Sequence, residues 1–185
     1  SGNISNQNYL EENEERGGGA GIYIYPEGDG QLQIQNSIVA GNTDMTDPDT
    51  AEHEKWPDVY GTVTSLGGNL IGDDTGSSGW DPSDIVGTAA SPVDPGLNTI
   101  LTLNPPGTTP THSRVEGSLA IDAVSCPTDF TLDQPGVTRP QGSDCDIGAY
   151  ELEQASTTGA LKISKVFNPL TSSFTGNFTI EYNCD

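Results

Sequence analysis

The sequence predicts an all-β protein, and three observations support this fold class. Its 185 residues include 23 glycines and 13 prolines, which divide the chain with turns and disfavour a helical bundle. The apolar residues form short runs between Gly- and Asn-rich turns, and within residues 31–35 they alternate with polar residues at a period of two. None of these runs has the i, i+3, i+4 spacing of an amphipathic helix.

In chain order, the expected strands of the first 72 residues lie within residues 21–25, 31–39, 59–66 and 69–72. A small residue followed by Gly-Asn recurs at positions 1–3, 40–42 and 67–69. The spacings are 39 and 27 residues, against the ~20–30 residues of one solenoid coil, and an inserted acidic loop would account for the longer one. The recurrence therefore predicts stacked coils in which asparagine side chains satisfy turn amides, although Gly-Asn is also a common turn pair.

Residues 73–155 are irregular and loop-rich, and we expect them to cap the last coil, whose apolar interior and strand edges would otherwise be exposed. The charge changes where this segment ends. Residues 1–155 hold four basic and 25 acidic side chains, whereas residues 156–185 are neutral overall. The sequence thus predicts coils over 1–72, a cap over 73–155, and a separate module from residue 156.

The charge also excludes classes of partner. Six Lys and Arg stand against 27 Asp and Glu, a net charge of −21, which disfavours binding to nucleic acid or to anionic lipid. The chain contains no apolar run of ~18 residues, so we expect no membrane insertion within it. Its first residues lack the features of a signal peptide, and we expect a piece of a longer exported chain.

Five motifs, taken in order, resemble the C-terminal region of bacterial right-handed parallel β-helix surface proteins of the "choice-of-anchor Q" type. They are residues 36–42, 61–72, 118–123, 133–140 and 145–151. This family is related to polymorphic outer-membrane and adhesin-like proteins. The resemblance implies a right-handed parallel β-helix, export from the cell, and a family that mostly lacks a demonstrated enzymatic activity.

Residues 159–169 and 174–182 resemble the first two strands of an immunoglobulin-like or prealbumin-like surface repeat. A complete module needs about seven strands, so these two cannot bury a sandwich core alone. We expect a cut-off domain, with strand donation to another chain as the alternative. The apolar residues of such an interchain strand are Leu161, Ile163, Val166, Phe178 and Ile180.

Two of the three cysteines, Cys126 and Cys145, lie in loop-rich sequence of an acidic chain that we expect to be exported. A disulfide between them is favoured over a metal pair, because no further Cys or His lies close in sequence. Cys184 has no evident partner in the sequence.

Catalysis has little support in the sequence. His53 lies in a polar loop, and His112 stands beside a serine without a nucleophile-elbow motif. A carbohydrate-active enzyme could use paired carboxylates, which the many acidic residues can supply by chance. It would also need cations for a uronate, and Arg139 is interpreted as structural because it belongs to one of the cap motifs.

Calcium is the one cofactor that the sequence suggests. Asp73, Asp74, Asp81 and Asp84 flank Gly76 and Gly79 and could supply the oxygen ligands that calcium prefers. Their spacing matches neither an EF-hand nor a calcium-binding repeat. The alternative is that these carboxylates cap turns.

The leading functional hypothesis is a non-enzymatic secreted or cell-surface module with a structural or adhesin-like role. Its partner would be a glycan or a protein, either a second copy or another surface protein, reached by strand pairing or end-to-end stacking. The alternatives are a carbohydrate-active β-helix enzyme, and a module that binds carbohydrate or calcium.

Overall fold

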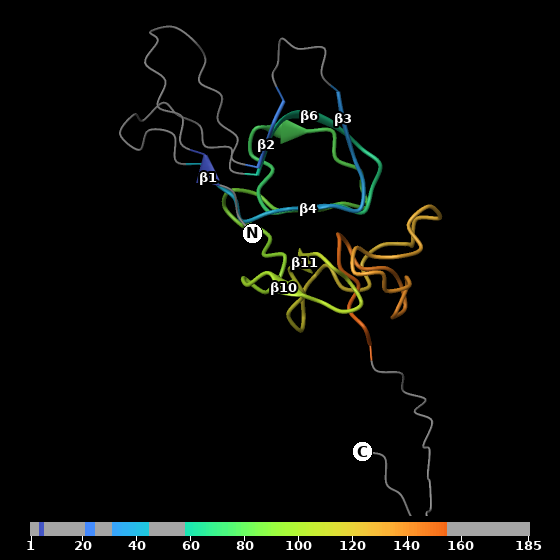
Figure 1. The fold of residues 1–185 in the computed structure, drawn as a ribbon. Helices are drawn as coiled ribbons and strands as arrows, with labels where there is room; N and C mark the ends of the chain where they lie inside the picture. The colour runs from blue at the N-terminus through green and yellow to red at the C-terminus, as the bar shows by residue number, and fades with distance from the viewer. Residues whose placement is uncertain (1–3, 6–20, 25–30, 45–57, 155–185) are drawn as a thin grey trace, which may run out of the picture. The chain divides into compact units, whose positions relative to one another are not determined.

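The computed structural model describes residues 4–5, 21–24, 31–44 and 58–154 (Figure 1). Every regular element within these residues is a β-strand and none is a helix, so the all-β prediction is confirmed. The chain divides into two units after Gln154. The second unit, residues 155–185, lies outside the described residues. The predicted residues that it contains are Leu161, Ile163, Val166, Phe178, Ile180 and Cys184.

Eleven short strands lie in the described residues. In chain order they are β1 (Ile4–Ser5), β2 (Ile22–Tyr23), β3 (Leu32–Ile34), β4 (Ile38–Val39), β5 (Thr43–Asp44), β6 (Val59–Ser65), β7 (Leu70–Ile71), β8 (Ser77–Ser78), β9 (Ile85–Val86), β10 (Thr102–Leu103) and β11 (Pro110–Thr111). Three of the four sheets are parallel: β1-β5, β4-β7-β9, and a sheet in which β6 pairs with β2, β3 and β8. The fourth is the antiparallel pair β10-β11.

The parallel pairing is in register. In one sheet Ile38 pairs with Leu70, and Leu70 pairs with Ile85. In the other, Leu32 pairs with Val63 of β6. Segments far apart in the sequence therefore become neighbours, and we refer to the described residues between 21 and 93 as the strand region. No sheet in the described part of the chain closes into a barrel.

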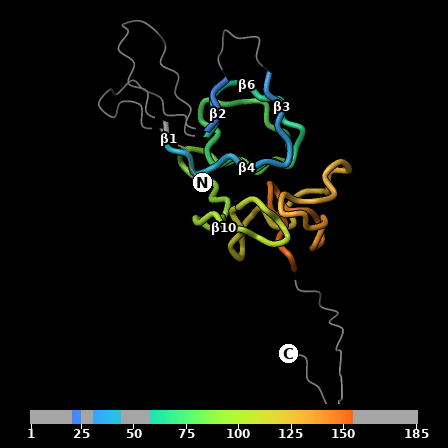
Figure 2. The backbone as a smooth tube through the Cα atoms, viewed as in Figure 1, coloured from blue at the N-terminus to red at the C-terminus, as the bar shows by residue number. Residues whose placement is uncertain are grey.

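The sheet β4-β7-β9 packs against other residues on both faces, and its central strand β7 is fully buried. Its outer face, formed by Ile38, Leu70 and Ile85, packs against Ala120 and Ile147 from later in the chain. The next residue of each strand packs instead with Val59 and Val63 of β6. Figure 2 shows the backbone of β6 opposite that of β4. Adjacent apolar residues are expected in such strands, because successive side chains point to opposite faces.

Polar residues precede all three strands of this sheet at equivalent positions: Ser37, Asn69 and Asp84. Asn69 is fully buried. Its Oδ1 accepts a hydrogen bond from the Ser37 amide at 3.0 Å, and its Nδ2 donates to Asp84 Oδ1 at 3.0 Å and to the Ile34 carbonyl at 3.3 Å. One short amide side chain thus joins three successive turns.

This register corrects the predicted Gly-Asn repeat. The repeat made Asn42 equivalent to Asn69, yet Asn42 follows β4 whereas Asn69 precedes β7. Asn42 donates through Nδ2 to the buried Asp58 carboxylate at 2.7 Å, which also accepts the Asp73 amide at 2.8 Å. The prediction failed because Gly-Asn suits any tight corner, and different corners of the chain use the same pair.

The regular strands continue past the predicted limit at residue 72, because β8 and β9 pair in parallel with β6 and β7. Each is only two residues long, which leaves no periodicity to detect. Gly79, at φ +94°, follows β8, and a Cβ there would collide with the Val63 carbonyl oxygen. The remaining irregular segment, residues 94–154, is called the cap below. Its apolar residues cover the outer face of the sheet β4-β7-β9.

Candidate functional site

The predicted calcium ligands cap turns. Asp73 Oδ1 accepts the Thr75 amide and hydroxyl at 2.9 and 2.6 Å, and Asp81 Oδ1 accepts the amide and hydroxyl of Ser83 at 2.9 and 2.7 Å. These bonds from Ser83 lower the pKa of Asp81. The backbone carbonyl of Asp74 accepts the Ser77 amide at 2.9 Å.

Asp84 belongs to the hydrogen-bonded polar residues around Asn69 in the strand region. Its Oδ1 accepts the Asn69 amide at 2.8 Å, and its Oδ2 accepts the Ser65 hydroxyl at 2.6 Å and the Asp81 amide at 2.7 Å. Within the described ranges, no three His, Cys, Asp or Glu residues are grouped so that they could hold a metal ion. Calcium binding stays a prediction, and the turn-capping alternative describes what the carboxylates of Asp73, Asp81 and Asp84 do in this structure.

Cys126 and Cys145 lie at disulfide distance, with their sulfurs 2.08 Å apart. Cys145 is fully buried, and its backbone pairs with Val124 in an isolated antiparallel bridge. The bond therefore joins two cap segments that also share backbone hydrogen bonds.

His112 and Ser113 both bind Asn98. His112 Nδ1 lies 2.6 Å from the Asn98 carbonyl oxygen, and Ser113 Oγ accepts from Asn98 Nδ2 at 2.6 Å. Because a carbonyl oxygen only accepts, Nδ1 carries the proton in this contact. His53 lies outside the described residues.

Two buried arginines hold the segment 145–151 of the cap. Arg114 Nε contacts Asp146 Oδ2 at 3.3 Å, and its Nη2 donates to the carbonyls of Ile147 and Tyr150. Arg139 Nη1 contacts Glu151 Oε2 at 3.1 Å, and its two Nη atoms also donate to the carbonyls of Asp146 and Gly148. Burial lowers the pKa of Arg114, against the favourable charge of Asp146.

Three buried carboxylates complete this network by accepting backbone amides. Asp133 accepts from Gly136, Val137 and Glu151; Asp146 accepts from Asp122 and Leu152; Glu151 accepts from Gln141 and Asp146. Burial is the main cause that raises the pKa of Glu151. Of these charged residues only Arg139 was predicted to be structural, although the acidic partners lie in the same motifs as Arg139 and Cys145. Glu151 had a detectable signal, since this charged residue lies between Tyr150 and Leu152.

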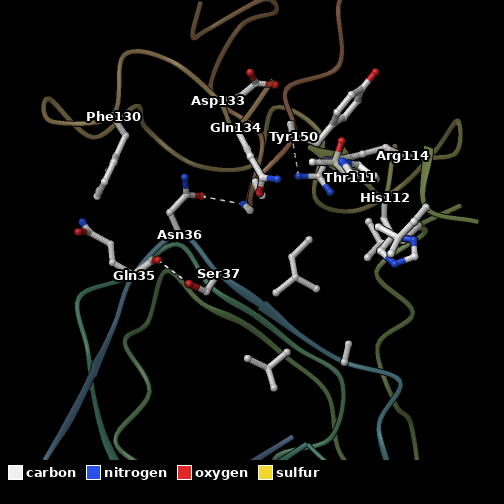
Figure 3. Close-up of a pocket in the computed structure, with 18 of the residues that line it drawn as sticks. Gln35, Asn36, Ser37, Thr111, His112, Arg114, Phe130, Asp133, Gln134 and Tyr150 are labelled. Carbon is white, nitrogen blue, oxygen red and sulfur yellow. Dashed lines mark hydrogen bonds between the residues drawn. The ribbon is translucent and has the colours of Figure 1, made fainter. Parts of the chain in front are cut away.

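A cavity of about 720 Å³ lies between the first strand of the outer face and the cap (Figure 3). Residues 35–40 and Ile22 line it from the strand region, and Thr111, His112, Phe130 and Tyr150 line it from the cap. In Figure 3, Phe130 extends from the cap toward Gln35 at one end of the opening, and His112 lies at the other. No pattern in the sequence indicates this cavity, since its two sides are distant in the chain.

Two buried polar atoms of the cavity's lining residues have no hydrogen-bond partner within the described part of the chain. They are Nε2 of His112 and Nε of Arg139. The Arg139 side chain is only 3% exposed. A buried polar atom without a partner is uncommon, so each of these atoms requires an explanation.

The fold and the site define a class: an all-β protein whose parallel strands are flanked by a disulfide-linked, arginine-held cap with a cavity beside it. Comparisons with protein-family models, with curated proteins and with solved structures find no match. Among the described residues no helix is long and apolar enough to cross a membrane.

Proposed function

We propose that the strand region forms coils of a right-handed parallel β-helix, and that the chain is a non-enzymatic secreted or cell-surface module with a structural or adhesin-like role. The order of the strands supports the coil interpretation. The chain visits the β6 sheet and the β4-β7-β9 sheet in alternation, through β3, β4, β6, β7, β8 and β9. Each return adds a parallel strand beside an earlier one, as successive coils of a solenoid do.

The observation that carries the functional proposal is the use of charge inside the cap. Arg114, Arg139, Asp133, Asp146 and Glu151 are directed at backbone amides and carbonyls of the cap itself. Their role is to fix irregular loops on a rigid support. Loops held on a rigid scaffold are suited to recognition. A carbohydrate-active enzyme would instead direct two carboxylates at its substrate.

The cysteine pair supports an extracellular location. Disulfides persist in oxidising compartments and are rare in reducing ones. The net charge of −21 is consistent with a heavily solvated surface. Both features agree with a module exposed outside the cell.

Adhesion can be tested with the full chain coupled to beads. We expect the beads to adhere saturably to surfaces coated with neutral glycans or with extracellular matrix proteins, and we expect soluble chain to compete. Beads coated with chain that has been reduced, alkylated and heat-treated serve as the control. In parallel, a panel of polysaccharides is incubated with the chain and assayed for newly formed reducing ends and unsaturated products.

Adhesion without product formation supports the proposal. Turnover of any polysaccharide would establish the enzyme alternative. Absence of adhesion on every surface, together with a monomeric chain in sedimentation at high concentration, would contradict both the adhesive and the assembly role.

A further inference from the structure

We propose that the cavity between β4 and the cap is a binding site for a neutral saccharide. This inference deepens the proposed adhesive function and rests on it. The cavity volume of about 720 Å³ lies within the range of small-ligand sites, which is roughly 300–1,000 Å³. The side chains around it indicate which chemical class of ligand it accepts.

The two buried atoms that lack a partner among the described residues need opposite partners. His112 donates through Nδ1 to the Asn98 carbonyl, and in the tautomer that carries its hydrogen on Nδ1, the atom Nε2 is an acceptor that needs a donor. Arg139 Nε carries a hydrogen and needs an acceptor. A hydroxyl group is both donor and acceptor, and a polyol presents several of them at short spacing. A carboxylate or phosphate could satisfy Arg139 alone.

Both atoms are covered by neighbouring groups, so contact with a ligand requires side chains at the rim of the cavity to rotate. Phe130, Leu101 and Leu132 line the cavity and are all more than half exposed, so solvent rather than packing surrounds much of each side chain. Rotation of these side chains would admit a ligand without disrupting the arginine network.

Phe130 also provides an apolar face. Its ring is 51% exposed and extends toward the strand residue Gln35, whose amide supplies both a donor and an acceptor (Figure 3). An aromatic face beside amide and hydroxyl groups fits a sugar ring, which has apolar C–H patches and polar edges. Gln134 and Thr111, also in the lining, extend the polar side of the site.

The electrostatics favour an uncharged ligand. The guanidinium groups of Arg114 and Arg139 face Asp146 and Glu151, so their charge is already balanced within the cap. The net charge of −21 repels polyanions at a distance. Uronate polymers and phosphorylated ligands are therefore disfavoured relative to neutral sugars.

The test is isothermal titration of the full chain with four neutral trisaccharides: cellotriose, maltotriose, mannotriose and chitotriose. Trigalacturonate is the anionic comparison. We expect at least one neutral sugar to bind with a Kd of about 1 mM or tighter, and trigalacturonate to bind about tenfold more weakly or not at all. Phe130→Ala should weaken binding about tenfold, and Phe130→Tyr should restore it. His112→Phe should weaken binding while Phe130 is intact.

Leu66→Ala is the matched control, because Leu66 has the same 51% exposure and does not line the cavity. Thermal unfolding of each variant shows whether a loss of binding reflects a loss of structure. Absence of binding by all four neutral sugars overturns the inference, and so does tighter binding of trigalacturonate. If the coated beads still adhere in either case, only this inference fails and the adhesive function stands.

Discussion

The strand region and the cap hold their backbones in place by different means. In the strand region, neighbouring parallel strands satisfy one another's backbone hydrogen bonds. The short side chain of Asn69 links the turns that precede these strands. In the cap, long side chains from Arg114 and Arg139 reach several carbonyls each. A repeated backbone can therefore be fixed by short polar side chains, whereas an irregular backbone needs long ones and a covalent link.

This difference predicts an asymmetry in stability. The cap packs on the outer face, whose strands β4, β7 and β9 pair with one another rather than with the cap. Damage within the cap should leave the strand region largely ordered. Damage within the strand region should loosen both, because the cap loses the surface on which it packs.

The largest expected effect is that of Arg114→Met. This change leaves the buried Asp146 carboxylate without its cation and two carbonyls without a donor, so we expect a loss of about 3–5 kcal/mol in the free energy of unfolding of the cap. Urea denaturation measures the loss, and hydrogen exchange locates it. Faster exchange should be confined to the cap. Glu116→Gln, at an exposed position, is the control, and equal acceleration in β6 and β7 would contradict the asymmetry.

Removal of the cysteine pair should be the next largest effect. In the Cys126→Ala/Cys145→Ala double variant the unfolded chain gains freedom, and the chain-entropy model gives a loss of about 3 kcal/mol. Reduction of the wild-type chain should produce a similar shift in melting temperature and none in the double variant. If reductant left the melting temperature of the wild-type chain unchanged, the cysteine pair would not stabilise the cap.

Asn69→Ala tests the strand region. The variant leaves the Ser37 amide without its acceptor in a buried turn, and we expect a loss of about 2 kcal/mol. Exchange should accelerate in both the strand region and the cap, unlike in Arg114→Met. Asn98→Ala, at an exposed position, is the matched control. Acceleration limited to β4 and β7 would mean that the cap is independent of the turns.

The smallest effect concerns pH. Burial raises the pKa of Asp58 above its ordinary 3.8, so the folded protein binds this proton more tightly than the unfolded chain does. The stability that Asp58 contributes should therefore increase as the pH falls from 7 through its folded pKa. Urea denaturation from pH 7 to about pH 4 should show wild type gaining stability relative to Asp58→Asn.

Asp81 provides the opposite case. Hydrogen bonds from Ser83 lower its pKa below 3.8, so its contribution should be lost only as the pH falls below that value. The stability difference between wild type and Asp81→Asn should stay constant over the range in which Asp58 titrates. A parallel change in both differences would point to the overall charge of the chain rather than to burial.

The sequence was sufficient to predict the strand region's fold class and several of its strands. Alternating and paired apolar residues report local geometry, and residues 31–39 and 59–66 contain β3, β4 and β6. The point at which the parallel strands end was harder to predict, because β8 and β9 contain only two residues each and are too short to show an apolar periodicity. The Gly-Asn repeat gave a wrong prediction because Gly-Asn indicates that the chain bends, but not whether the bend precedes or follows a strand of the sheet.

Apart from the Cys126–Cys145 pair and the structural role of Arg139, the cap was predictable only as a loop-rich segment. Its order depends on contacts such as that between Arg114 and Asp146, which join residues far apart in the sequence. The cavity was not predictable for the same reason, since Phe130 and β4 meet only when the cap folds onto the outer face. Sequence patterns describe neighbours along the chain, and this site consists of neighbours in space.

The two apolar faces of the sheet β4-β7-β9 affect how the register of its strands is determined. In a strand with one buried face, a shift by one residue exposes apolar side chains and is strongly disfavoured. A shift in β4, β7 or β9 would exchange Ile38 with Val39 or Leu70 with Ile71, and both positions would remain apolar. Hydrophobicity therefore discriminates poorly between the two alignments. The buried amide of Asn69 discriminates well, because only one alignment gives it its partners. The information that aligns these strands is thus carried by one polar side chain in the turn.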